Sequence, residues 1–407
     1  MRIGIVGPVN PASLAEWLNE KNIPAINTSA SAVNTLVKGF LEDGHELQIF
    51  TLTTEKLQKK RELKGNRITI HLIPIGLLPK IMGIHQFVIG QFYLPQRIVN
   101  VIRKHIGDIN VLHAHWTYEY AKAASLVSNK VPVFCTVRDW CPYQLSLMKG
   151  RSRLDWLLKN ITFKQVMADE RITFIANSDY THRMITKAYP EKIVPVIPNP
   201  IYKDWIVQDF KKSKPIDTAF RFISIATGLC SPRKNIKTLL EAFAKYRYQH
   251  SKAELHLVGG YNENDSAYIK WKQRGWLTGV KMHGMLSHEQ LMSLLDKMDC
   301  LVHPAWEETF GNILLEAMSR GVPCIGGQDS GAVSDVLGHG EYGLTCNIRD
   351  AQSILNTMEI ISDSMIYHRL QVEAIKMLRV KYASDVVTRM HIEIFQSKIN
   401  AIQSTDV

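Results

Sequence analysis

Short, nearly uninterrupted apolar stretches alternate with amphipathic stretches along most of the chain, and this alternation limits the possible folds more than any other feature. The strands expected in the first half are residues 2–6, 46–52, 68–73, 110–114, 132–137, 172–176 and 194–197. The strands expected in the second half are residues 221–226, 254–258, 280–283, 299–303 and 322–326. The helices expected between them include residues 31–41, 235–248, 288–297 and 312–320. Short apolar strands separated by helices form parallel sheets that are covered on both faces, so the sequence predicts an α/β fold.

The length of the chain predicts two domains in tandem. It has 407 residues, of which 45% are apolar, so each half can bury its own core. Residues 203–219 are polar and charged and contain a proline, which is typical of a linker. We expect a first doubly wound, Rossmann-like domain over residues 1–205, a second over residues 206–380, and a last helix over residues 381–407 that packs back on the first domain. Ligands bind at the carboxyl ends of such strands, so we expect the domains to face each other across a cleft.

The charge balance favours anionic partners. The chain has 49 Lys and Arg against 38 Asp and Glu, which gives a net charge of +11. Phosphates and anionic membrane surfaces are attracted by such a surplus. The densest basic run, residues 59–67, contains no aromatic residue, so nucleic acid is not an expected partner.

The cysteines, the apolar stretches and the first residues of the chain predict its compartment and its association with membranes. The six cysteines form no C-x-x-C pair, and no apolar stretch of about 18 residues is long enough to cross a bilayer. The start, MRIGIVGP, is too short for the apolar part of a signal peptide, so we expect a cytoplasmic protein. Residues 72–94 are unusually apolar and follow the basic run. They are either a helix that covers the sheet or a segment that dips into an anionic membrane face, which would place the protein peripherally on the inner side of the membrane.

Residues 303–327, HPAWEETFGNILLEAMSRGVPCIGG, place a glutamate on each side of an expected turn. Glu308 falls in a loop between a strand and a helix, and Glu316 falls one turn inside that helix. We expect Asn312 to cap the helix and Gly321 to end it. The N–H groups at the start of a helix bind anions. A phosphate bound there would leave the two carboxylates to accept hydrogen bonds from sugar hydroxyls, so the pattern favours a nucleotide-sugar site over two solvated glutamates.

This stretch resembles the signature of glycosyltransferase family 4, whose members are retaining enzymes with the GT-B fold. The matching residues are Glu308, Phe310, Gly311, Leu315, Glu316, Ala317, Met318, Gly321 and Pro323. Further segments that resemble the family are residues 31–51, 175–185, 196–201 and 287–304. The resemblance implies a nucleoside diphosphate sugar donor, with UDP or GDP as the favoured nucleotide, bound by residues 225–335. It also implies a hydroxyl acceptor on the first domain and no obligatory metal ion.

The resemblance assigns a role to a basic loop, TGLCSPRKN, over residues 227–235. The family carries an Arg directly after the glycine of this loop, but here Leu229 stands in that place. Lys234 matches the family's Lys, and we expect Arg233 to supply the missing charge from a shifted position. Both cations would stabilise the leaving diphosphate. The alternative is a solvated basic pair at a helix start.

Two further features belong to the first domain. The family has a histidine in the stretch that is CTVRDWCP here, where Arg138 and Asp139 stand instead. Arg138 is a candidate for binding a phosphate or a carboxylate, and the alternative is a surface ion pair between the two residues. His113 and His115 lie on one side of a strand end, but no third metal ligand is evident, so we interpret them as a polar lining or as core residues.

The expected site is therefore defined residue by residue. The candidate catalytic residues are Glu308, Arg138, Asp139, Arg233 and Lys234. The candidate donor-binding residues are Gly7, Gly228, Arg233, Lys234, Gly259, Glu308, Thr309, Phe310, Gly311, Asn312, Ile313 and Glu316.

The sequence thus predicts a retaining transferase that moves a sugar to a glycan or a lipid-linked oligosaccharide in cell-surface polysaccharide synthesis. One alternative is a nucleotide-sugar epimerase or a phosphorylase on the same fold. A second is a non-catalytic module that binds nucleotides. A dinucleotide-dependent oxidoreductase is a weaker alternative, because GIVGPVNPAS lacks the G-x-G-x-x-G spacing.

Overall fold

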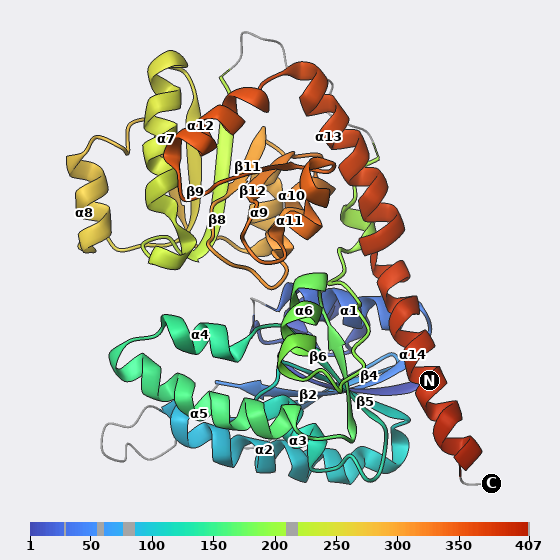
Figure 1. Ribbon diagram of the computed structural model, residues 1–407. Coiled ribbons are helices and arrows are strands. Elements are labelled where there is room, and N and C mark those ends of the chain that lie inside the picture. Colours follow the sequence, from blue (N-terminus) through green and yellow to red (C-terminus); the bar gives the residue numbers. More distant parts are fainter. Residues whose placement is uncertain (28–29, 55–60, 76–85, 209–218, 406–407) are drawn as a thin grey trace. The chain divides into compact units, whose positions relative to one another are not determined.

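The computed structural model describes residues 1–27, 30–54, 61–75, 86–208 and 219–405. The chain forms two compact units, the first made of Met1–Pro200 with Ser384–Val407 and the second of Ile201–Ala383. Figure 1 shows the α/β layering of each unit. The predicted α/β class is confirmed: each unit is built on a sheet of mainly parallel strands with helices packed on it.

The first unit has a seven-stranded sheet in the order β3-β4-β2-β1-β5-β6-β7. Its strands are β1 (Arg2–Val6), β2 (Glu46–Thr53), β3 (Arg61–Gly65), β4 (Ile68–Pro74), β5 (Val111–His115), β6 (Val133–Val137) and β7 (Ile172–Ala176). Its helices are α1 (Ser31–Glu42), α2 (Gln86–His105), α3 (Glu119–Ser125), α4 (Cys141–Leu147), α5 (Gly150–Met167), α6 (Asp179–Ala188) and α14 (Ser384–Thr405), with short 3₁₀ turns at Pro11–Trp17 and Ile106–Asp108. All strand pairs are parallel except β3 with β4.

Two apolar layers cover the faces of this sheet. One layer joins α2, α3 and α5, which Figure 1 shows together on one side of the strands. The other joins α1 and α14. The ring of Phe395 on α14 lies 4.6 Å from that of Phe134 on β6. A Cβ atom at Gly39 of α1 would come within 2.1 Å of the Thr388 hydroxyl of α14, so the glycine allows these helices to approach closely.

The second unit has a six-stranded parallel sheet in the order β10-β9-β8-β11-β12-β13. Its strands are β8 (Arg221–Gly228), β9 (Glu254–Gly260), β10 (Val280–Gly284), β11 (Cys300–His303), β12 (Cys324–Gly327) and β13 (Leu344–Cys346). Its helices are α7 (Ile236–Gln249), α8 (Ser266–Gln273), α9 (His288–Leu295), α10 (Asn312–Ser319), α11 (Val333–Val336), α12 (Ala351–Ile360) and α13 (Ser364–Met377). Short turns lie at Lys203–Trp205, Pro232–Lys234, Gly338–Gly340 and Leu378–Tyr382.

The expected strand at residues 194–197 is wrong. Only a single bridge forms there, between Val196 and Ala176. Pro195 and Pro198 lack the N–H groups that a strand ladder requires, so the segment cannot pair along its length. Conversely, β3 and β13 were not expected, because β3 is a charged edge strand with a single buried apolar side chain, Leu63, and β13 is only three residues long.

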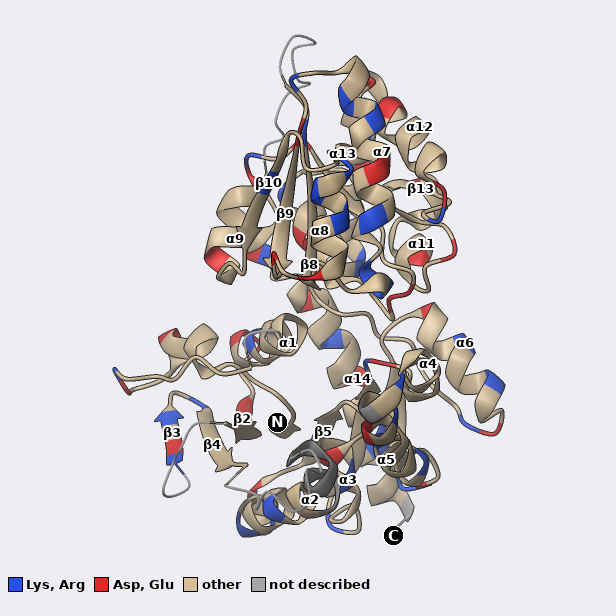
Figure 2. Cartoon of the chain, turned by 90° about the vertical axis from the view of Figure 1, so that its left-hand side faces the viewer, with Lys and Arg blue, Asp and Glu red and all other residues tan. Residues whose placement is uncertain are grey.

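Charged side chains of both signs are distributed over both units. Figure 2 shows Lys and Arg spread over many elements of each unit and interleaved with Asp and Glu. None of the helices in the described part of the chain combines the length and the apolar character needed to cross a bilayer. Of the apolar segment 72–94, residues 76–85 lie outside the described residues, and α2 begins at Gln86.

Candidate active site

The turn that enters α10 is shaped by a glycine. Gly311, with φ 86°, is the residue that precedes the first turn of α10, and it has no side chain with which to cap the helix. The expected cap by Asn312 is wrong, because Asn312 already has helical geometry and is the first residue of α10. Gly311 reaches the left-handed conformation without the steric cost that a side chain would bring. The first N–H groups of a helix have no partner within it and attract anions.

Lys234 and Glu308 form the central ion pair of the second unit. The Lys234 Nζ atom donates to the Glu308 Oε1 atom over 2.5 Å, and the side chains are 13% and 22% exposed. His303, at the end of β11, places Nε2 3.5 Å from the same oxygen. Burial alone would raise the pKa of Glu308, but His303 and Lys234 outweigh it and lower this pKa to about 2. Glu308 is therefore a permanently ionised acceptor rather than a solvated loop residue.

Hydrogen bonds fix the backbone of Glu308 in addition to its side chain. Its N–H donates to the Ser330 carbonyl over 3.3 Å, and its carbonyl accepts from the Ala332 N–H over 2.9 Å. These bonds form a parallel bridge between Glu308 and Gly331, which belongs to the glycine-containing turn after β12. Two strand-to-helix loops thus fix the position of one carboxylate.

Glu316 lies on the second turn of α10 and is buried. Its Oε1 atom is 3.7 Å from the His288 Nε2 atom at the start of α9. The His288 ring lies against Trp205, with ring centroids 4.4 Å apart. The interpretation of Glu316 as a solvated helix residue is therefore wrong, since a buried carboxylate requires partners of this kind.

The ends of β8 and β9 complete this edge of the sheet. Gly228 pairs with Gly260, and the Leu229 N–H donates to the Gly260 carbonyl. A Cβ atom at Gly259 would lie 1.7 Å from the Ala226 carbonyl oxygen, so only glycine fits there. Leu229, which stands at the family's usual Arg position, is fully buried in the core.

Arg233 shares a short 3₁₀ turn with Lys234. The carbonyl of Arg233 accepts a hydrogen bond from the Trp306 N–H over 3.0 Å, which ties this turn to the loop after β11. The guanidinium of Arg349 lies 5.3 Å from the centroid of the Trp306 ring. Three cationic residues, one of them not anticipated, thus belong to the loops around Glu308.

A second polar group lies in the first unit, at the carboxyl ends of β1, β5 and β6. The Arg138 Nε atom donates to His115 Nδ1 over 3.2 Å, and Nη1 donates to Asn199 Oδ1 over 2.6 Å. Burial lowers the pKa of Arg138 to about 10. A Cβ atom at Gly7 would lie 3.1 Å from the His115 side chain, so Gly7 belongs to the same group.

Asp139 accepts a hydrogen bond from the Tyr118 hydroxyl over 2.9 Å. Arg138 and Asp139 therefore each have partners inside the first unit, and the alternative of an isolated surface pair is wrong. His113 and His115 are fully buried, and burial lowers the pKa of both. They are core residues beneath Arg138.

Two family models together match most of this chain. Residues 29–205 match the model described as Glycosyltransferase Family 4, and residues 208–377 match the model described as Glycosyl transferases group 1. The chain belongs to glycosyltransferase family 4. It is an enzyme that transfers a sugar from a nucleotide sugar.

Two curated relatives of this glycosyltransferase match over most of their length at low sequence identity. N-acetyl-alpha-D-glucosaminyl L-malate synthase of Bacillus anthracis is 21% identical over 383 residues, which cover 91% of this chain and 94% of that protein. Alpha-1,3/1,6-mannosyltransferase ALG2 of Candida glabrata is 22% identical over 348 residues, which cover 74% and 73% of the two chains.

Solved structures identify the GT-B fold. Sucrose-phosphate synthase from Thermosynechococcus elongatus superimposes with a TM-score of 0.75 at 16% identity and covers 98% of this chain and 100% of that chain. HepE of Anabaena in complex with UDP-glucose gives a TM-score of 0.66 at 15% identity, again with 98% and 100% covered. An E. coli trehalose-6-phosphate structure bound with UDP-2-fluoro glucose gives 0.70 at 10% identity, with 97% and 99% covered. The predicted fold is confirmed.

The sequence-predicted residues of this glycosyltransferase fall into two groups. In the second unit, the loops that bring Lys234 to Glu308 also contain Thr309 and Gly311, followed by Asn312 and Ile313 of α10. In the first unit, Gly7 and Arg138 meet around His115. The side chain of Phe310 is buried against the Tyr382 ring, so only its backbone is available to a ligand.

Three residues of the glycosyltransferase site were not predicted. His303 lies against Glu308 and lowers its pKa. His288 and Arg349 come from distant positions in the sequence. Only the packing of their elements brings them near Glu316 and Trp306, so no local pattern points to them.

Proposed function

We propose that this glycosyltransferase works with retention of anomeric configuration and holds the donor diphosphate between Lys234 and the amino end of α10. The observation that carries the proposal is the ion pair of Lys234 with Glu308 in the loop that leads into that helix. In this proposal Lys234 and Arg233 stabilise the leaving diphosphate, Glu308 accepts hydrogen bonds from the donor sugar, and Glu316 accepts them from the ribose. Gly228 and Gly259 let the nucleotide approach the backbone.

The proposed transfer balances without a protein nucleophile. The bond between the sugar C1 atom and the diphosphate oxygen breaks, and the oxygen keeps the electron pair. The acceptor oxygen forms the new bond to C1 on the same face, and its proton moves to the departing phosphate. A carboxylate with a pKa of about 2 is a poor general base near neutral pH, so Glu308 is better suited to holding the sugar than to removing that proton.

We infer that the donor is a UDP-sugar, with a GDP-sugar as the second candidate. Structures with the same fold are described in complex with UDP, UDP-glucose and UDP-2-fluoro glucose. No obligatory metal is part of this proposal, because Lys234, Arg233 and the helix dipole supply the positive charge that a diphosphate needs.

We infer that the acceptor binds to the first unit, near Arg138, Asp139 and Gly7. A half-buried guanidinium with hydrogen-bonded neighbours can orient a polar acceptor or its charged group. The acceptor class that we propose is a glycan or a lipid-linked oligosaccharide used in cell-surface polysaccharide synthesis.

Membrane association is part of the same proposal. Helix α5 exposes Leu154, Leu157 and Ile161, which are 55%, 43% and 45% exposed and share one face at spacings of three and four residues. Exposed Arg153 and Lys164 lie on the same helix. An apolar face flanked by cations binds anionic bilayers, so this helix would bring the first unit to the cytoplasmic membrane face.

A flotation assay tests the membrane part. The protein should float with anionic liposomes at low salt and should remain behind with zwitterionic ones. Leu157→Asp should abolish flotation, whereas the matched change Met365→Asp, at a residue that is 81% exposed on α13 of the other unit, should not. If the native protein does not float with anionic liposomes at low salt, the proposed membrane association is wrong.

The donor is tested by thermal-shift measurements with UDP, GDP, ADP and TDP and their sugars. The proposal expects the largest stabilisation with UDP and its sugars. Product formation with a candidate acceptor should then be followed by NMR, which reports the anomeric configuration of the new bond. Turnover of the donor without any acceptor would favour an epimerase, and inversion would overturn the retaining mechanism.

A further inference from the structure

A cluster of three potential metal ligands lies in the first unit, among residues that the transfer reaction does not use. Glu62 on β3, His71 on β4 and His105 at the end of α2 each bring a ligand atom within 4.8 Å of the others. The His71 Nδ1 atom is 3.2 Å from the Glu62 Oε1 atom, and the His105 Nε2 atom is 3.9 Å from that same oxygen.

The fold itself brings these residues together. Glu62 and His71 are directly opposite each other in the antiparallel pair of β3 with β4, so their side chains share one face of the sheet. His105 is the last residue of α2, which covers that face. The Phe50 ring stacks on His71 at 4.9 Å and 9°, and the rings of His71 and His105 lie 4.3 Å apart.

The hydrogen bonding of His71 suits a cation between its ring and Glu62. His71 is 3% exposed, and its Nε2 atom lies 2.8 Å from the Gln48 Oε1 atom. An amide oxygen only accepts, so Nε2 carries the proton and Nδ1 presents a lone pair. Among the described residues the buried Nδ1 atom has no hydrogen-bond partner, and it faces a carboxylate oxygen that is also an acceptor. Two acceptors at 3.2 Å repel each other unless a cation, or a proton on Nδ1, lies between them.

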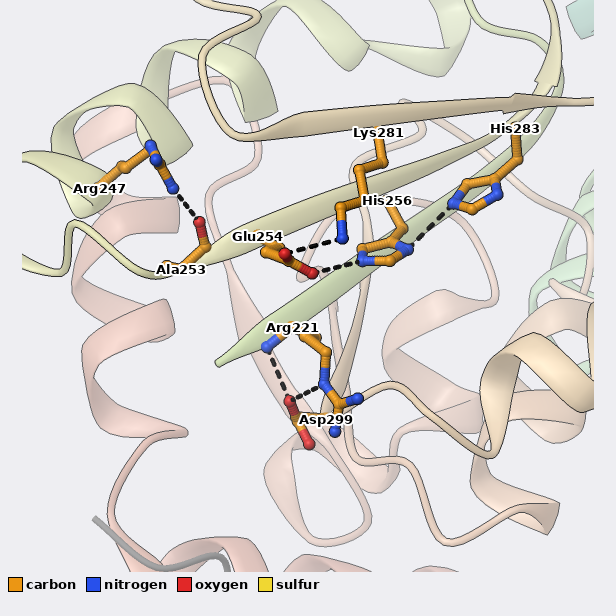
Figure 3. A network of polar contacts seen from close by, with 8 residues as sticks. All are labelled: Arg221, Arg247, Ala253, Glu254, His256, Lys281, His283 and Asp299. Atoms are coloured by element: carbon orange, nitrogen blue, oxygen red, sulfur yellow. Dashed lines mark hydrogen bonds and ion pairs between the residues drawn. The ribbon is translucent and has the colours of Figure 1, made fainter. Parts of the chain in front are cut away.

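A cluster of the same composition in the second unit shows the difference. Figure 3 shows Glu254, His256 and His283 joined in a chain with Lys281. The Lys281 ammonium lies 2.8 Å from Glu254, and His256 bonds to Glu254 through Nε2 and to His283 through Nδ1. Both nitrogens of His256 have partners, whereas His71 Nδ1 has none among the described residues. A lysine lies near the carboxylate in each cluster, Lys281 at 2.8 Å from Glu254 and Lys64 at 3.8 Å from Glu62. The hydrogen bonds within that cluster therefore leave no nitrogen of His256 free to bind a metal ion.

We propose that Glu62, His71 and His105 form a binding site for a zinc-type divalent cation. Zinc bonds of about 2.0–2.2 Å to imidazole and carboxylate place tetrahedral ligands about 3.3 Å apart, so the observed 3.2 and 3.9 Å need only a small closure. Two imidazoles select zinc over magnesium or calcium, which prefer oxygen ligands. Gln48 is the second partner that fixes the ring of His71.

The site is open to solvent and links three elements. The side chains of Glu62 and His105 are 42% and 28% exposed, so a cation can enter and a water can take the fourth position. Bound metal would tie the edge strands β3 and β4 to the end of α2. This role is structural and does not depend on the proposed transfer mechanism.

The test uses full-length protein without a histidine tag, treated with a chelator and then dialysed. Titration calorimetry with zinc sulfate should give one tight site per chain, and cobalt should give the absorption bands of a four-coordinate ion. Glu62→Gln and His105→Gln change partly exposed residues and should weaken the tight site at least about 100-fold. Gln48→Leu should weaken it about 10-fold to 100-fold.

The matched control is His283→Gln, in the cluster of the second unit, which should leave the tight site unchanged. The proposal is overturned if no stoichiometric site is found. It is also overturned if Glu62→Gln and His105→Gln bind zinc like the native chain, because His71 then only donates a hydrogen bond to Glu62. Equal weakening by His283→Gln would assign the binding to the other cluster and would likewise contradict it.

Discussion

The Lys234 ammonium donates to the Glu308 carboxylate over 2.5 Å, although the two residues are 74 positions apart in the chain. Lys234 comes from the loop after β8, and Glu308 comes from the loop after β11, which is the neighbouring strand in the sheet. The carboxyl ends of neighbouring parallel strands meet at one edge, and this is where doubly wound folds bind ligands. The pair therefore lies at the edge of the sheet where we propose that the donor binds.

Replacing Glu308 with Gln is expected to lower kcat about 100-fold to 1,000-fold. The amide keeps the shape but loses the negative charge that pairs with Lys234 and that we propose to hold the sugar hydroxyls. Steady-state kinetics with saturating donor measure this change, and circular dichroism should show an unchanged fold. A variant with native kcat would show that Glu308 does not act on the donor sugar.

Replacing Glu316 with Gln is expected to act on donor binding rather than on the chemical step. Losing a charged hydrogen-bond acceptor costs about 1.5–3 kcal/mol, so the KM for the donor should rise about 10-fold to 100-fold while kcat changes little. The measurement compares kcat and KM of this variant with those of Glu308→Gln, for which we expect mainly kcat to fall. An equal loss of kcat in both variants would contradict the separate roles of ribose and sugar contacts.

Gly259→Ala is expected to destabilise the second unit by at least about 2 kcal/mol. The new methyl group would lie 1.7 Å from the Ala226 carbonyl, and φ at Gly259 is 144°. Gly228→Ala is the matched control, because nothing lies within 4 Å of the position of its Cβ atom. Gly259→Ala should unfold at a lower urea concentration than Gly228→Ala. Equal midpoints would show that the end of β9 tolerates a side chain at residue 259.

Acid is expected to weaken the first unit through His391. Burial, more than the nearby Arg138, lowers the pKa of His391 to about 4, while an unfolded histidine has a pKa of about 6.5. The unfolded state therefore binds the proton first, and stability falls as the pH drops from about 6.5 to about 4. At pH 5 this group alone accounts for about 2 kcal/mol.

His391→Gln removes the titrating group, so its denaturation midpoint should change less between pH 7 and pH 5 than that of the native chain. His339→Gln, at a residue whose side chain is 73% exposed, is the control. If the native chain and His391→Gln respond to acid equally, the buried neutral state of His391 is not what makes the unit acid-sensitive.

The fold could be predicted from the sequence because its central strands are short, apolar on both faces and separated by helices. The errors arose where this signal is absent. β3 is a charged edge strand, and residues 194–197 are apolar but contain Pro195 and are followed by Pro198, which prevent pairing. Burial and pairing depend on neighbouring strands, and a local pattern does not contain them.

The candidate site could be predicted in part for the same reason. Glu308, Glu316 and the glycines lie in one continuous stretch, so their spacing is visible in the sequence. The pairing of Glu308 with Lys234 and His303, and that of Glu316 with His288, depends on which strands and helices become neighbours. The cap at α10 was assigned to Asn312 because asparagine favours that place, whereas the left-handed turn requires Gly311.

The most direct test of the donor site is the affinity of UDP for the native chain and for Lys234→Met, measured by titration calorimetry. Losing one charge-assisted contact to a phosphate costs about 1.5–3 kcal/mol, so the Kd for UDP should rise about 10-fold to 100-fold. Uridine, which has no phosphate, should bind both proteins equally. If UDP binds Lys234→Met as tightly as it binds the native chain, the diphosphate is not held at the pair of Lys234 with Glu308 and the central claim is wrong.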